Sequence, residues 1–194
     1  TTREVTMEDM LYHTESVARG VKNAFIVGDM PYGSYGTIDD AIANAKRLIA
    51  AGADGVKLEG GIEKEGLYDI IRAIVSREIL VQGHIGFTPQ SPIDQLTDEG
   101  YIQGTTPEGI SKLGEDARMV QEAGAFSTVL EMVPHLVSKE ITDMLRIPTI
   151  GIGAGPKCDG QVLVVYDLLE LSGTEKPKRF VWTYPDLSIS RAIE

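Results

Sequence analysis

Short apolar runs alternate with longer stretches in which apolar residues recur at helical spacing along most of the chain. The short runs predict buried strands, and the longer stretches predict amphipathic helices. Strand candidates are expected at 24–28, 55–61, 79–86, 126–133, 148–153 and in an apolar run at 161–171. Helices are expected at 6–19, 37–52, around 65–76, 111–123 and 138–145.

The first two helices carry clear start signals. Thr6 and Thr37 each precede a periodic stretch and can cap it, with acidic residues such as Asp9 and Asp40 in the first turn. Gly52 is a stop signal for the second helix. These signals predict where the first two helices begin and where the second one ends.

Six strand candidates that alternate with helices indicate an α/β protein with a parallel sheet. Either a doubly wound open sheet or a (β/α)₈ TIM barrel would fit. A barrel needs eight units and typically about 250 residues, more than this chain offers. However, no G-x-G-x-x-G motif follows the first strand, and polar residues recur where strands end. These residues are Asp29, Glu59, His84 and Glu131, and their placement favours a barrel mouth.

Composition bounds the possible partners. The chain of 194 residues carries a formal net charge of −11, which disfavours binding to nucleic acid or to an anionic membrane surface. No apolar run approaches the roughly 20 residues that cross a bilayer, and the first residues lack a signal-peptide pattern. A single cysteine excludes an internal disulfide framework. We therefore expect residues 1–194 to form one cytoplasmic domain, with no nucleic-acid or membrane partner.

The stretch GVKLEGG at 55–61 carries the most informative signal. Lys57 and Glu59 are two residues apart on a short strand, so their side chains point to the same face. Buried strands rarely carry two charges on one side unless these pair or serve a site. The glycines that follow place the pair at the carboxyl end of the strand, where α/β enzymes keep their chemistry.

Asp29 and Glu59 are candidate metal ligands because two carboxylates at neighbouring strand ends suit Mg²⁺ and leave positions for substrate oxygens. Lys57 beside them could meet a substrate carboxylate or stabilise a developing enolate oxygen. Structural roles remain open for each. Asp29 could accept from amides of the following turn, and Glu59 could cap a helix or pair with Lys57.

Glu131 and His84 are the remaining candidates. Glu131 ends an otherwise apolar strand, and carboxylates in apolar surroundings have raised pKa values that suit proton transfer near neutral pH. We expect it to act as a general acid or base, against the alternative of a structural hydrogen bond. His84 is equally compatible with substrate contact and with a satisfied core position.

Other polar features are weaker signals. The glycine-rich run Gly151 to Gly155 allows close backbone approach but also makes ordinary tight turns. Cys158 has no plausible base nearby in the sequence, and we interpret it as incidental. His13 and His135 are expected at surface or packing positions.

Six segments, taken together, resemble the ketopantoate hydroxymethyltransferase family, whose barrel is related to the phosphoenolpyruvate mutase and isocitrate lyase barrels. They are DMLYHTESVARG, GDMPYGSY, AGADGVKLEGG, GHIGFTPQS, LEMVP and IPTIGIGAG followed by CDGQVLV, in this order along the chain. The resemblance implies transfer of a hydroxymethyl group from 5,10-methylenetetrahydrofolate to 3-methyl-2-oxobutanoate (α-ketoisovalerate). The product would be 2-dehydropantoate, on the route to pantothenate and coenzyme A.

The resemblance also implies roles for individual residues. Asp29 and Glu59 match two of the family's Mg²⁺ ligands, and carboxylate ligands would also accept Mn²⁺ or Co²⁺. Asp29 and Lys57 match positions that bind the keto acid, and Glu131 matches the proton acceptor. The reaction would pass through an enolate stabilised by Mg²⁺. The family forms large homo-oligomers, so a homo-oligomer is expected.

The chain also departs from the family pattern. The first two β/α units, with a further metal-ligand aspartate, and part of the last helix are expected to be missing, so this would be a partial (β/α)₈ barrel. Phe87 stands where the family favours Leu, and Met132 where it favours a small residue or Cys. Two alternatives therefore stay open: a related metal-dependent C–C lyase or mutase on 2-oxo acids, or an inactive truncated paralogue with a binding role.

Overall fold

The computed structural model describes residues 2–61, 66–91, 100–169 and 171, and within them the chain forms one six-stranded parallel sheet. Each strand pairs with the next in the chain, in the order β1 to β6. The strands are β1 (Val27–Asp29), β2 (Gly55–Glu59), β3 (Leu80–Gly86), β4 (Ser127–Glu131), β5 (Thr149–Ile152) and β6 (Gly160–Gln161).

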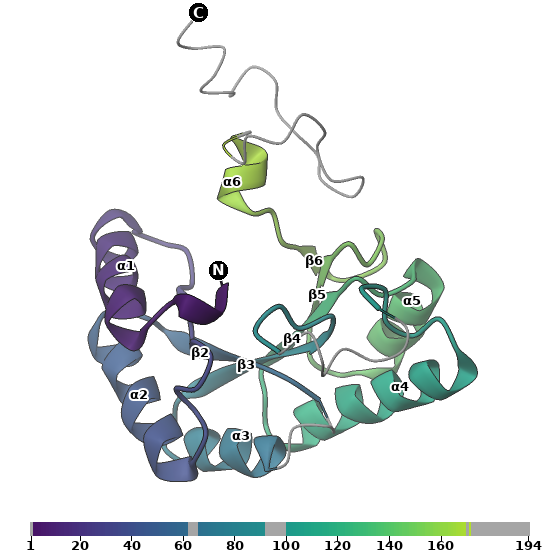
Figure 1. The fold of residues 1–194 in the computed structure, drawn as a ribbon, viewed down its shortest axis with the longest axis horizontal. Helices are drawn as coiled ribbons and strands as arrows, with labels where there is room; N and C mark the ends of the chain where they lie inside the picture. The colour runs from purple at the N-terminus through teal and green to yellow at the C-terminus, as the bar shows by residue number, and fades with distance from the viewer. Residues whose placement is uncertain (1, 62–65, 92–99, 170, 172–194) are drawn as a thin grey trace, which may run out of the picture.

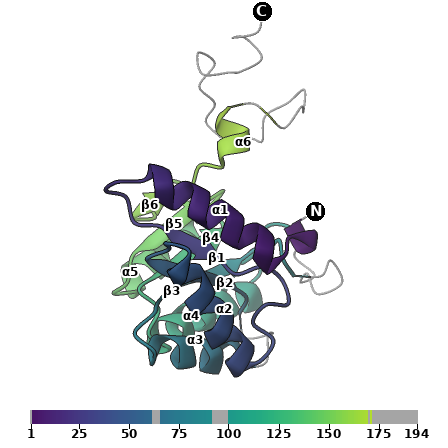
Figure 2. The same ribbon diagram turned by 90° about the vertical axis from the view of Figure 1, so that its left-hand side faces the viewer.

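Helices α1 to α5 lie in an arc around the strands (Figure 1). A short 3₁₀ helix at Thr2–Glu4 precedes them, and α6 stands apart from the sheet in both ribbon views (Figure 2). The helices are α1 (Met7–Gly20), α2 (Ile38–Ala50), α3 (Leu67–Val75), α4 (Pro107–Glu122), α5 (His135–Met144) and α6 (Val165–Leu168). Among the described residues, none of these helices has both the length and the apolar character that crossing a membrane requires.

The strand order decides between the two architectures that the sequence allowed. A doubly wound sheet reverses its strand order at a switch point, whereas this sheet continues in one direction. The result is a half-barrel of six parallel strands. Within the described part of the chain, β1 and β6 are each paired on one side and not with each other.

The register of the ladders places the strand ends at a common rim. Asp29 pairs with Lys57, two residues before Glu59, and Glu59 pairs directly with His84. Glu131 pairs with Gly86, two residues beyond His84. The polar residue thus advances by two, none and two residues from strand to strand. This is close to the stagger of about one residue per strand that a tilted eight-stranded barrel has.

The helices cover the sheet through faces that recur every three or four residues, as amphipathic helices do. In α2 the buried face comprises Ala41, Ala45 and Leu48, and in α3 it includes Ile70, Ile71 and Ile74. The predicted caps are present, since Thr6 and Thr37 accept hydrogen bonds from the amides of Asp9 and Asp40. These contacts fix the helices against the strands whose ends form the site.

The first strand differs from the expected range. It was predicted at 24–28, but it comprises Val27–Asp29 and so includes the aspartate. Phe25 is apolar yet exposed, and the amide of Ile26 donates to Oδ2 of Asp54 instead of to a neighbouring strand. A side-chain oxygen thus replaces the ladder at this point and delays the start of β1.

Three further boundaries were wrong. Helix α4 begins at Pro107, because Thr106 caps it and proline suits the first helical position, while α5 begins directly after Pro134. The apolar run at 161–171 is not a strand beyond Gln161, and it contains α6. The expected start of the third helix at 65 lies outside the described residues, and α3 itself begins at Leu67.

Candidate active site

Four neighbouring strands bring charged side chains together at their carboxyl ends. Lys57 Nζ lies 2.9 Å from Oδ1 of Asp29 and 3.1 Å from Oε1 of Glu59. The prediction that Lys57 and Glu59 share one face of their strand is therefore confirmed. The two carboxylates belong to β1 and β2, and the ammonium between them neutralises part of their mutual repulsion.

His84 continues this chain of contacts to the fourth strand. Its Nδ1 lies 3.4 Å from both Nζ of Lys57 and Oε1 of Glu59. Its Nε2 lies 3.0 Å from the carbonyl of Phe87 and 3.2 Å from Oε2 of Glu131. Both neighbours of Nε2 are acceptors, so this nitrogen carries a proton.

Direct contact of His84 with a substrate stays a prediction. The side chain is buried, and both of its ring nitrogens have protein neighbours. Its evident role in the structure is to join Glu59 to Glu131. Glu131 is less enclosed, with a side chain that is 16% exposed, so it can be reached from the mouth of the half-barrel.

The two candidate metal ligands have opposite pKa shifts. Burial alone would raise the pKa of Glu59, but hydrogen bonding to His84, the charges of His84 and Lys57, and the Gln90 amide together lower it to about 2. Burial raises the pKa of Asp29 above its ordinary value, although Lys57 opposes this. Glu59 is thus held firmly anionic, whereas Asp29 depends on its cationic neighbour.

The carboxylates in turn raise the pKa values of the cationic side chains, Lys57 and His84. Burial would lower the pKa of Lys57, but the charges of Asp29 and Glu59 outweigh it and raise the pKa. For His84, burial and the Lys57 charge lower the pKa, and the contacts with Glu131 and Glu59 raise it above the ordinary value. The site therefore stabilises positive charge at both side chains.

Two buried residues that the sequence analysis did not single out complete the site. Gln90 and Tyr35 are 4% and 2% exposed. The Gln90 amide N–H donates to Oε2 of Glu59 at 3.0 Å, and the Tyr35 hydroxyl lies 3.2 Å from Oε1 of Gln90. Both lie in segments that resemble the family, GDMPYGSY and GHIGFTPQS, which is the signal that could have found them.

The donor set fits a hard divalent cation such as Mg²⁺. Oδ1 of Asp29 is buried and lies 2.9 Å from Nζ of Lys57 without a hydrogen bond of ordinary geometry, and Glu59 adds a second anionic oxygen donor. Mg²⁺ usually takes one or two carboxylates and fills its other positions with water or substrate oxygens. Among the described residues, no three His, Cys, Asp or Glu side chains gather closely enough to hold a metal ion by themselves.

The backbone around Glu131 is unusual. Met132, the next residue, has φ = 54°, a left-handed backbone conformation that residues other than glycine rarely adopt. Its amide donates to Ile152, and its carbonyl accepts from Gln103. The carbonyl of Glu131 accepts from the amide of Phe87 at 2.9 Å. These bonds hold the end of β4 in place despite the strain.

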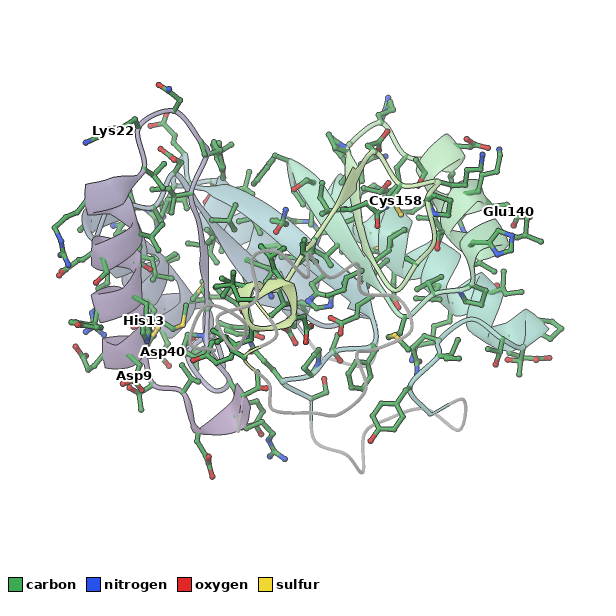
Figure 3. All side chains as sticks on the ribbon, turned by 90° about the horizontal axis from the view of Figure 1, so that it is seen from above. Asp9, His13, Lys22, Asp40, Glu140 and Cys158 are labelled. Carbon is green, nitrogen blue, oxygen red and sulfur yellow. The ribbon has the colours of Figure 1, made fainter. Side chains whose placement is uncertain are left out.

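Other polar residues lie away from this cluster. His13 is on α1 and Cys158 is near α5, on opposite sides of the sheet in the view of Figure 3. Burial raises the pKa of the Cys158 thiol, which disfavours the reactive thiolate. A Cβ on Gly151 would lie close to Cys158, and one on Gly155 close to His135, so these glycines allow the close approach of those two residues.

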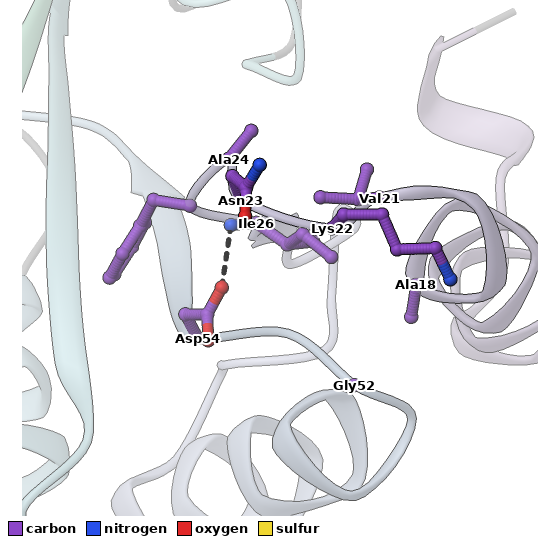
Figure 4. A pocket seen from close by; sticks show the side chains of 9 residues that line it. Ala18, Val21, Lys22, Asn23, Ala24, Ile26, Gly52 and Asp54 are labelled. Atoms are coloured by element: carbon purple, nitrogen blue, oxygen red, sulfur yellow. Dashed lines mark hydrogen bonds between the residues drawn. The ribbon is translucent and has the colours of Figure 1, made fainter.

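A hollow of about 550 Å³ lies at the opposite end of β1 from Asp29 (Figure 4). It is lined by the segment 21–26 together with Ala18, Gly52 and Asp54. Its carboxylate, Asp54, already accepts from the amide of Ile26 at 2.8 Å. This hollow brings together no group of side chains suited to catalysis.

Solved structures show the same fold. The half-barrel resembles phosphoenolpyruvate phosphomutase from Streptomyces platensis subsp. rosaceus, with a TM-score of 0.62, 15% identity and coverage of 88% of this chain and 64% of that one. It also resembles a 2,3-dimethylmalate lyase, with a TM-score of 0.55, 17% identity and coverage of 98% and 64%. Fold and site together define a parallel α/β protein with charged side chains at the carboxyl ends of its strands.

The sequence comparisons identify the family. The family model for ketopantoate hydroxymethyltransferase matches residues 1–194. A 3-methyl-2-oxobutanoate hydroxymethyltransferase of Clostridium botulinum (strain Langeland) is 50% identical over 191 residues, which is 97% of this chain and 67% of the relative. The enzyme of that name from Pyrobaculum islandicum is 50% identical over 186 residues, or 95% and 68%.

The chain therefore belongs to the ketopantoate hydroxymethyltransferase family. It spans about two thirds of the length of the curated relatives that it matches. The resemblance noted from the sequence is thus confirmed at the level of the family.

Proposed function

We propose that the protein transfers a hydroxymethyl group from 5,10-methylenetetrahydrofolate to 3-methyl-2-oxobutanoate and forms 2-dehydropantoate. The family membership supports this reaction, which serves the synthesis of pantothenate and coenzyme A. The observation that carries it is the unbroken chain of contacts from Asp29 through Lys57, Glu59 and His84 to Glu131. This arrangement places cations for an anionic substrate and a carboxylate for proton transfer at one rim.

The proposed roles follow from where each side chain lies. Lys57 binds the anionic keto acid and stabilises negative charge on its 2-oxo oxygen once the C3 proton has left. Glu131 accepts that proton at its carboxylate, and His84 orients Glu131 through Nε2. Water releases the one-carbon unit from the folate as formaldehyde, so that both of its bonds to nitrogen break and the two nitrogens take up the hydrogens of the water. C3 then forms a bond to the formaldehyde carbon, and the formaldehyde oxygen takes up a proton and becomes the hydroxyl group.

Asp29 and Glu59 would hold Mg²⁺, with Mn²⁺ or Co²⁺ as possible substitutes. When bound, the cation supplies Lewis-acid polarisation of the 2-oxo group, which acidifies the neighbouring C–H bond. The low pKa of Glu59, about 2, keeps this ligand anionic throughout the physiological range. Asp29 also lies beside Lys57, so it can take part in binding the keto acid.

The six strands are proposed to be part of a (β/α)₈ barrel. Their continuous order and the stagger of their ends support this, as does the length of the relatives. A homo-oligomer is part of the same proposal. A version extended with the amino-terminal strands of the family would show whether further units are needed for activity.

The test is an assay of hydroxymethyl transfer with Mg²⁺, repeated after addition of EDTA, on this chain and on the extended version. Transfer that depends on the metal, in either version, is the expected result. If both versions are folded and neither forms 2-dehydropantoate, the proposed reaction is refuted. Turnover of the keto acid without folate would instead favour a lyase on 2-oxo acids.

A further inference from the structure

A tight turn after β3 presents Gln90 to both candidate metal ligands. The amide of Ser91 donates to the carbonyl of Thr88 at 2.9 Å, and their hydroxyls are 2.7 Å apart, which closes the turn. Pro89 occupies the second position, where its fixed φ favours such a turn. The amide of the third residue, Gln90, is not used inside the turn and can donate to another group.

Gln90 uses this amide and its side chain to join β1 to β2. Its backbone N–H donates to Oε2 of Glu59 at 3.0 Å. Its side-chain Nε2 donates to the carbonyl of Met30 at 3.1 Å and lies 3.5 Å from Oδ2 of Asp29. Because Met30 directly follows Asp29, a single residue fixes the ends of both strands that carry the carboxylates.

The neighbours of Gln90 settle the orientation of its amide. The Met30 carbonyl and the Asp29 carboxylate accept hydrogen bonds, so the NH₂ group has to point toward them. Oε1 of Gln90 then faces the hydroxyl of Tyr35 at 3.2 Å.

The Tyr35 hydroxyl contacts the oxygen of the Gln90 side-chain amide. This hydroxyl has one proton, and Oε1 of Gln90 at 3.2 Å and the carbonyl of Glu59 at 3.3 Å both lie within reach as acceptors. The same hydroxyl accepts from the amide of Glu59 at 3.3 Å. Tyr35 therefore contacts both Gln90 and the strand that carries Glu59.

We infer that Gln90, held by Tyr35, is a positioning residue that sets the spacing of the Asp29 and Glu59 carboxylates for a divalent cation. The inference rests on the proposed function, because it assumes that these carboxylates hold a metal. Two carboxylates on separate strands repel each other and would spread without donors that fix them. Outer hydrogen bonds of this kind orient metal ligands and strengthen binding.

The chain offers matched residues that separate this role from simple stabilisation. Gln82 donates through Nε2 to Ser127 at 2.9 Å, also between two strands, and this bond does not involve the carboxylates. Tyr68 is buried and donates to Asp116 at 2.7 Å from a different part of the fold. Replacing these residues removes comparable hydrogen bonds whose partners are Ser127 and Asp116 and not the carboxylate pair.

The experiment measures Mn²⁺ binding by the loss of the free-ion signal in electron paramagnetic resonance, with and without 3-methyl-2-oxobutanoate. The variants are Gln90→Met and Tyr35→Phe, with Gln82→Met and Tyr68→Phe as controls. Melting temperatures in EDTA show whether each variant is folded. Turnover is then followed at increasing Mg²⁺.

We expect Gln90→Met to weaken Mn²⁺ binding by about 10- to 100-fold, the range typical for loss of an outer hydrogen-bonding partner. Tyr35→Phe should weaken it less, both controls should bind like the wild type, and high Mg²⁺ should restore turnover in Gln90→Met. Equal affinity of Gln90→Met and Gln82→Met would overturn the positioning role alone. Failure of the wild type to bind Mn²⁺ even with the keto acid would overturn the metal assignment, and this inference with it.

Discussion

Nε2 of His84 lies 3.2 Å from Oε2 of Glu131, across the ladder that joins β3 to β4. Through Nδ1 the same ring reaches Glu59 at 3.4 Å. One imidazole thus connects the proposed proton acceptor with a proposed metal ligand. The proposed proton transfer and the proposed metal binding would therefore be linked through His84, and changes at His84 should affect both.

Replacement of Glu131 by Gln should abolish proton removal from the keto acid. The amide keeps the shape of the side chain but cannot accept the C3 proton, so exchange of that proton with deuterated solvent should slow by about 100-fold or more. Nuclear magnetic resonance of the keto acid measures the exchange. Glu140→Gln, on the exposed face of α5, is the control and should exchange at the wild-type rate. Undiminished exchange in Glu131→Gln would exclude this residue as the base.

Replacement of His84 by Gln should destabilise the protein in a pH-dependent manner. The folded state raises the pKa of His84 above its ordinary value of 6.5, so its stabilising effect is complete below about pH 6.5. It is lost as the pH rises through the folded-state pKa. Urea unfolding should show a gap between wild type and variant that narrows with rising pH. A gap that widens toward alkaline pH would contradict the assigned charge.

Replacement of Glu59 by Gln should make the free energy of unfolding depend less on pH in the acidic range. The pKa of Glu59 falls from an ordinary 4.5 to about 2 on folding, so its contribution is present above about pH 5 and lost toward pH 2. A shift of this size corresponds to about 3 kcal/mol. Unfolding free energies between pH 2 and pH 7 measure it. The variant should remain folded at neutral pH and lose metal-dependent turnover; unchanged turnover would remove the metal assignment.

Replacement of Gly86 by Ala should displace the end of β4. Gly86 has φ = 90°, and a Cβ there would lie 2.4 Å from the carbonyl oxygen of Glu131. We expect a loss of roughly 1–3 kcal/mol in the free energy of unfolding, with lower activity. Gly114→Ala, inside α4 with nothing within 4 Å of the added atom, should instead stabilise by about 0.5–1 kcal/mol. Equal effects of the two substitutions would refute the steric argument.

The rim of charged residues could be predicted because strand periodicity and the parallel order of the strands are both visible in the sequence pattern. Strand period two places Lys57 and Glu59 on one face, and parallel strands bring their carboxyl ends together. The hydrogen bonds of Gln90 and Tyr35 could not be predicted from periodicity, since they join residues 55 positions apart. The start of β1 was missed for a similar reason, because the side chain of Asp54 takes the bond that the sheet would otherwise supply.

Because the strands are staggered, the geometry of the site depends on how the sheet bends. Laid flat, the register would leave Glu131 four residues, or about 13 Å, further along the strand direction than Asp29. Tilt and curvature remove this offset, so the meeting of these side chains belongs to the whole wall of strands and not to any one loop. A partly flattened sheet would keep the hydrogen bonds between its strands, and circular dichroism would still show it as folded. Such a protein would nonetheless be inactive. Activity should therefore be lost under milder denaturing conditions than those at which spectroscopy detects unfolding.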